Sequence, residues 1–72
     1  MLLGKTKRTI EEKEAAIQLN LSNNYKNSAK KAFEEYVAII EQFKENGKLS
    51  SKDYEKLNLK IKDYSEKFKR MK

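Results

Sequence analysis

The side chains that could do chemistry in this chain are carboxylates, lysines and tyrosines, because its 72 residues contain neither cysteine nor histidine. No thiol can act as a nucleophile, and no imidazole can act as a general base near neutral pH. The usual zinc ligands and all disulfides are absent for the same reason. Nearly all the carboxylates fall where an amphipathic helix would face water. We therefore expect no enzymatic activity, no cofactor and no metal site.

The formal net charge of +6 indicates an anionic partner, either nucleic acid or a membrane surface. Of the 17 basic residues, however, only Arg8 and Arg70 are arginine, the residue that reads phosphate and guanine best. The abundant Lys, Asn, Ile, Tyr and Phe are residues that AT-rich codons favour. We therefore prefer codon bias as the source of the charge. Nucleic-acid binding through the third helix and the N-terminal arm remains the alternative.

Two apolar stripes predict two helices, because their steps of three and four residues place each stripe on one helical face. The helix expected over about 24–45 carries Ala29, Phe33, Tyr36, Ile40 and Phe43. The helix expected over about 51–71 carries Tyr54, Leu57, Ile61, Tyr64, Phe68 and Met71. The two helices should fold back on each other as a hairpin. A dimeric coiled coil is less favoured, since each stripe covers only about three heptads.

The turn between these helices has a stop signal followed by a start signal. Asn46-Gly47 suits a helix end, with Gly47 in the left-handed position that follows the last turn. Ser50 then suits the N-cap of the next helix, with Asp53 as the acid of a capping box. Leu49 and Tyr54 can pack together as a hydrophobic staple.

Thr9 and Glu12 form a capping box that predicts a first helix over about 9–20. Residues 1–8 are basic and aperiodic, and we expect them to be a disordered arm in front of a single helical domain at 9–72. The Asn-rich stretch 20–24 favours a break, with Ser22, Asn23 or Asn24 as the N-cap of the second helix. A continuous kinked helix is the alternative.

The apolar face of the second helix is wide enough to contact two neighbours, which predicts an all-α three-helix bundle built on the hairpin. We expect a monomer or a weak homodimer. The tyrosines on the stripes should pack in the core with their hydroxyls at its edge, rather than form a stacking platform for nucleic acid. The residues expected to be most buried are Phe33, Ile40, Leu57, Ile61 and Phe68.

The segment 20–29 resembles the TTRAP family, small transposon-encoded proteins of bacterial conjugative transposons. The likeness rests on Asn23-Asn24-Tyr25-Lys26, on the Ala and aromatic helix from Ala29 to Phe43, and on Gly47-Lys48-Leu49. It covers roughly residues 17–68 and departs at Asn27, where the family pattern has an acid. The resemblance implies an all-helical fold and residence on a mobile element. It implies no catalytic residue.

The candidate interaction site is Asn23, Asn24, Tyr25 and Lys26, since two Asn beside a Tyr that lies off the apolar stripe are poor helix material. The preferred interpretation is structural: an Asn caps the second helix and Tyr25 covers the end of the core. The function expected is that of a non-enzymatic accessory protein that binds another protein. The sequence shows no apolar run long enough to span a membrane, and we expect a cytoplasmic location without membrane partners.

Overall fold

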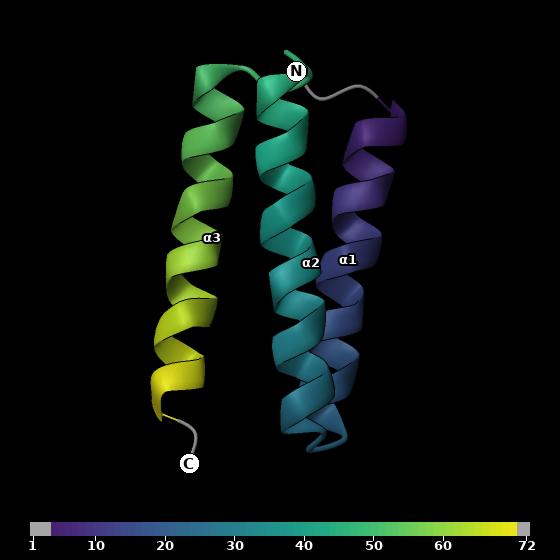
Figure 1. Ribbon diagram of the computed structural model, residues 1–72, viewed down its shortest axis with the longest axis vertical. Coiled ribbons are helices and arrows are strands. Elements are labelled where there is room, and N and C mark those ends of the chain that lie inside the picture. The colour runs from purple at the N-terminus through teal and green to yellow at the C-terminus, as the bar shows by residue number, and fades with distance from the viewer. Residues whose placement is uncertain (1–3, 71–72) are drawn as a thin grey trace.

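This computed structural model describes residues 4–70 of the chain. They form three helices joined by two turns, and each helix runs antiparallel to the one before it (Figure 1). Helix α1 spans Gly4–Ser22, α2 spans Lys26–Glu45 and α3 spans Ser51–Arg70. No strand occurs in these residues. The expected all-α three-helix bundle is confirmed, and the expected third helix is confirmed as far as Arg70. Residues 1–3 and 71–72 lie outside the described part.

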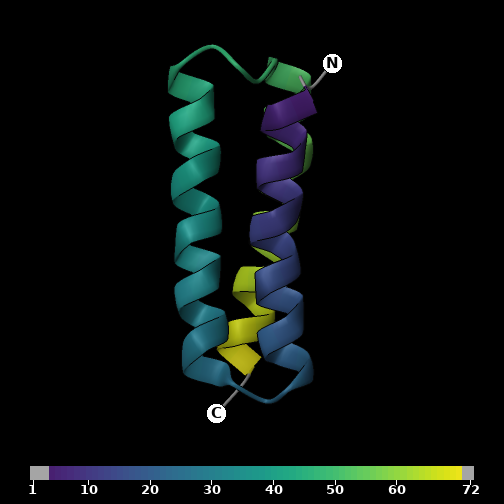
Figure 2. The same cartoon turned by 90° about the vertical axis from the view of Figure 1, so that its right-hand side faces the viewer.

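Helix α2 is the centre of the bundle. Figure 1 shows it between α1 and α3, and Figure 2 shows α1 and α3 on the same side of it. The α1–α2 turn therefore lies at the same end as the C-terminal end of α3, and the α2–α3 turn lies beside the beginning of α1 (Figure 1). This arrangement agrees with the wide apolar face of the second helix in the sequence.

Helix α1 begins at Gly4 and not at Thr9. The predicted capping box is wrong, because the Thr9 hydroxyl donates to the Lys5 carbonyl at 2.9 Å, as happens inside a helix. Thr6 is only 3% exposed and lies one turn before the buried Ile10. Packing of this extra turn thus extends the helix beyond its local start signal. The described residues 4–8 of the expected arm are therefore helical, and residues 1–3 of that arm lie outside the described part.

The α2–α3 turn has the predicted helix end at Gly47 and the predicted N-cap at Ser50. Gly47 has φ of +71°, and the N–H groups of Gly47 and Lys48 donate to the carbonyls of Lys44 at 3.1 Å and Phe43 at 2.9 Å. These two bonds are the hydrogen-bond pattern of a Schellman motif. The Ser50 hydroxyl then accepts from the Asp53 N–H at 3.1 Å, so its role as the N-cap of α3 is confirmed.

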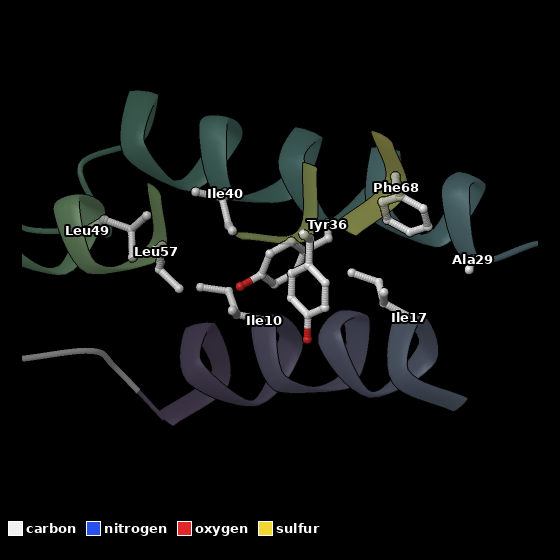
Figure 3. Packing of buried hydrophobic residues seen from close by; sticks show 9 residues of the cluster. Ile10, Ile17, Ala29, Tyr36, Ile40, Leu49, Leu57 and Phe68 are labelled. Carbon is white, nitrogen blue, oxygen red and sulfur yellow. The ribbon is translucent and has the colours of Figure 1, made fainter. Parts of the chain in front are cut away.

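The core draws on all three helices and on the α2–α3 turn (Figure 3). Its rings pack in tilted and edge-on geometries, with centroid distances of 5.3 Å for Phe33–Phe68 and 6.1 Å for Tyr36–Tyr64. Such arrangements favour contact of a ring edge with a ring face. The buried hydrophobic residues are Ile10, Ile17, Ala29, Tyr36, Ile40, Leu49, Leu57, Tyr64 and Phe68.

The prediction of the most buried residues is correct for Ile40, Leu57 and Phe68 and wrong for Phe33 and Ile61, which are only partly buried. Phe33 lines an open groove between α2 and α3. Tyr36 instead is fully buried, and its ring packs edge-on against Tyr64 of α3. Its hydroxyl has no hydrogen-bond partner, so the expectation of a tyrosine tip at the edge of the core is wrong for this residue.

Candidate functional site at the α1–α2 turn

Of the four predicted site residues, Asn23, Asn24 and Tyr25 form the connection between α1 and α2, and Lys26 is the first residue of α2. The expected break is therefore present, and a continuous kinked helix is excluded. The N–H of Asn24 donates to the Leu21 carbonyl at 3.1 Å, and the N–H of Tyr25 donates to the Asn20 carbonyl at 2.8 Å. This is a second Schellman motif, with the same pattern as at Gly47.

Asn24 takes the position that glycine takes in the other turn. Its φ is +61°, the left-handed region that Asn tolerates better than most residues. Asn24 thus ends α1. The predicted side-chain cap of α2 is absent from the connection. The N-cap of α2 is Tyr25, and its side chain makes no capping hydrogen bond. The predicted capping role of Ser22, Asn23 or Asn24 is therefore wrong.

Tyr25 is 60% exposed, so its ring does not cover the end of the core. The preferred structural interpretation of this residue is thus contradicted. The backbone around it is fixed, because its N–H bonds to Asn20 and its carbonyl accepts from the Ala29 N–H at 2.8 Å. A hydrogen-bonded turn therefore presents a large aromatic side chain to solvent. The ring borders a shallow surface hollow that is lined by Asn24, Tyr25, Lys26, Asn27 and Ser28.

Leu19 adds a second exposed apolar side chain at this end of the molecule. It is 63% exposed, and its carbonyl accepts from the Asn23 N–H at 3.1 Å, one helical turn before the connection. Leu19 is not among the site residues predicted from the sequence. The signal was present, since Leu19 lies off the face that carries Ile10 and Ile17. The described residues have three exposed large hydrophobic side chains, and two of them, Leu19 and Tyr25, lie here.

A polar cluster between α1 and α3 is the other concentration of functional groups. The Tyr64 hydroxyl donates to Glu14 at 2.9 Å and accepts from the Gln18 amide at 3.1 Å, and the Lys60 ammonium lies 3.2 Å from the same carboxylate. Burial raises the pKa of Tyr64, the Gln18 hydrogen bond lowers it, and Glu14 raises it. Each group has a partner within the cluster. Its chemistry is therefore that of a structural link between two helices.

Within residues 4–70, no group of three acidic, cysteine or histidine side chains is placed to hold a metal ion. None of the described helices is long and apolar enough to cross a membrane.

Comparisons of the chain with protein-family models, with curated proteins and with solved structures found no match. The function proposed below therefore rests on the residues of the chain, on their geometry and on the resemblance to the TTRAP family.

Proposed function

We propose that this chain is a non-enzymatic accessory protein of a mobile genetic element, and that it acts in the cytoplasm as a small protein-interaction module. The assignment to a mobile element rests on the resemblance to the TTRAP family. The interaction surface comes from one observation: Tyr25 is exposed on a backbone that its neighbours fix. Ordering a flexible loop on binding costs free energy, and a turn that is already ordered avoids most of this cost.

The chemistry of the turn defines the kind of partner. Tyrosine offers a large apolar ring and a polar tip, and it is enriched at the centre of protein interfaces. The Tyr25 side chain accepts no capping hydrogen bond from the first N–H groups of α2. A partner segment that packs an apolar side chain on the Tyr25 ring and offers a polar group to its hydroxyl would match both ends of this side chain. Leu19 would extend the apolar contact.

Nucleic-acid binding through α3 and the basic beginning of the chain is the alternative. Lys5, Lys7 and Arg8 are exposed on α1, which favours it. Helix α3 itself carries seven cations and four acids, a net charge of only +3, and its exposed positions include both signs. One of the seven, Lys60, is paired with Glu14. The mixed charge of this helix gives the protein-binding proposal more support.

The test is capture of a partner from a bacterial lysate of a host that carries a conjugative transposon. The immobilised chain is compared with Tyr25→Ala, and bound proteins are identified by mass spectrometry with and without nuclease treatment. We expect nuclease-resistant capture of a specific protein that Tyr25→Ala loses. The purified partner should then bind the chain directly in calorimetry, at least tenfold more weakly after the substitution.

Leu59→Ala is the matched control, because it also truncates an exposed large hydrophobic side chain, on α3. Circular dichroism establishes that both variants stay folded. Equal capture by the parent chain and Tyr25→Ala would overturn the role of the turn. Capture that depends on nucleic acid, or sub-micromolar binding to DNA near physiological salt, would favour the alternative instead.

A further inference from the structure

Leu59 is an exposed apolar side chain at the middle of α3, and at 65% it is exposed even more than Tyr25. It lies about 180° around the helix from the buried Phe68, given about 100° per residue. Helix α3 forms one edge of the bundle in Figure 1. Leu59 therefore marks the centre of the helix face that turns away from α1 and α2.

The charges around Leu59 have a regular order. Within about two turns of Leu59 on either side, this face of the helix carries, in sequence, Lys52, Glu55, Lys56, Lys62, Asp63 and Glu66, all of them exposed. Within residues 4–70, none of these six side chains forms an ion pair or hydrogen bond with another residue. We call this set, with Leu59, the outer face of α3.

The outer face is complementary to itself when two copies of α3 run antiparallel. A two-fold axis at Leu59 brings together residues that lie about equally far before and after it, on the same flank of the helix. Glu55 then meets Lys62 of the second copy on one flank, and Lys56 meets Asp63 on the other. Each pair has opposite signs, and symmetry forms each of them twice.

The same geometry brings Lys52 of one copy to Glu66 of the other, one layer out from the central pair of Leu59 side chains. A parallel, in-register pairing would instead place every charge against its own copy, lysine on lysine and acid on acid. Like charges at such positions are repulsive, so charge order selects the antiparallel arrangement.

We infer that the outer face of α3 is a homodimer interface, in which two copies of this chain pair antiparallel about Leu59. This inference concerns a different face from the α1–α2 turn and does not depend on the proposed function. A single leucine layer buries little apolar area, so the dimer is weak and reaches a high population only at about millimolar chain concentrations. Its charge pairs are exposed, so added salt weakens it.

Sedimentation equilibrium tests the inference. The chain is measured at low ionic strength over a series of concentrations that reaches about millimolar. We expect Leu59→Glu to abolish the dimer. Glu55→Lys and Lys62→Glu should each weaken it by at least about tenfold, because each creates two like-charge contacts in the symmetric pair. Circular dichroism confirms that these exposed substitutions leave the helices folded.

Mixing the two charge variants is the decisive experiment. A Glu55→Lys chain and a Lys62→Glu chain restore both flanking pairs when they meet, so the mixture should form a heterodimer although each variant alone is monomeric. Lys31→Glu is the matched control, since it has the same net charge as Lys62→Glu but lies on α2. It should dimerise normally, and it should form no stronger complex with Glu55→Lys than the parent chain does.

A parent chain that stays monomeric at millimolar concentration overturns the inference. So does a dimer that survives Leu59→Glu, or a mixture of the charge variants that stays monomeric. A heterodimer that forms equally well with Lys31→Glu would show that net charge alone drives association, and it would also overturn the specific pairing.

Discussion

The Tyr64 hydroxyl on α3 donates a 2.9 Å hydrogen bond to the Glu14 carboxylate on α1, across the open side of the bundle. Helices α1 and α2 pack closely along their length, whereas α1 and α3 approach each other mainly through side chains. Lys60 and Gln18 complete the polar cluster around this bond. The position of α3 relative to α1 therefore depends on a few polar groups as well as on the core.

Tyr64→Phe should lower the free energy of unfolding by about 1–2 kcal/mol, because it removes a partly buried hydrogen bond to a charged acceptor and keeps the ring. Urea denaturation measures the change. Tyr54→Phe is the control, since the Tyr54 hydroxyl also bonds a glutamate, Glu41, but at an exposed position. It should cost less than about 0.5 kcal/mol. Equal losses in the two variants would show that the Tyr64–Glu14 bond has no special role in holding α3.

Tyr36→Phe should stabilise the protein by about 1 kcal/mol. The Tyr36 hydroxyl is buried without a hydrogen-bond partner, so folding removes it from water with no compensating bond. Phenylalanine keeps the ring, its contact with Tyr64 and the packing of the core. A rise in the urea midpoint at unchanged slope measures the gain. A clear loss of stability would mean that the hydroxyl has a favourable interaction in the folded state.

The same residue makes stability depend on alkaline pH. Burial raises the pKa of the Tyr36 hydroxyl above its ordinary value, and the nearby Glu14 and Tyr64 raise it further. Below about pH 10 the hydroxyl is neutral in both states. Above that pH the unfolded chain releases the proton first, so stability falls as the pH rises toward the folded-state pKa. Tyr36→Phe should lose less stability between pH 9 and about 11 than the parent chain.

Local signals predicted the helix end at Gly47 and the N-cap at Ser50 correctly, because both residues act on backbone groups within a few residues of themselves. The capping box at Thr9 has an equally good local pattern and fails. There, burial of Thr6 against the bundle favours another helical turn. A local pattern cannot report such a contact, which depends on residues distant in sequence.

The candidate site shows the same limit. Its position in a helix break followed from the poor helix propensity of Asn23 and Asn24, and the structure confirms that break. The structural role of each of these residues was not predictable from the sequence. Asn can serve as an N-cap or take the left-handed position at a helix end, and the choice at Asn24 depends on how α1 and α2 pack together. The exposure of Tyr25 follows from that choice.

Asn24→Gly should leave stability unchanged or raise it slightly, whereas Asn24→Ala should cost about 1 kcal/mol, because only glycine has no penalty at a φ of +61°. Thermal unfolding of both variants measures the difference. Asn23→Ala is the neighbouring control and should cost less than about 0.5 kcal/mol. A larger loss for Asn23→Ala than for Asn24→Ala would place the structural asparagine one residue earlier and remove Asn24 as the end of α1.

Ile17→Ala should cost more stability than Ile61→Ala, although Ile61 belongs to the more regular apolar stripe. Ile17 is fully buried, and Ile61 is only partly buried. Truncating a buried isoleucine costs about 2–5 kcal/mol, since it removes apolar contacts and leaves a cavity. A domain of this size has only a few kcal/mol in reserve, so Ile17→Ala should be largely unfolded at 37 °C by circular dichroism. Ile61→Ala should stay folded with a lowered melting temperature. The reverse order would mean that α3, rather than α1, supplies the more important half of the core around α2.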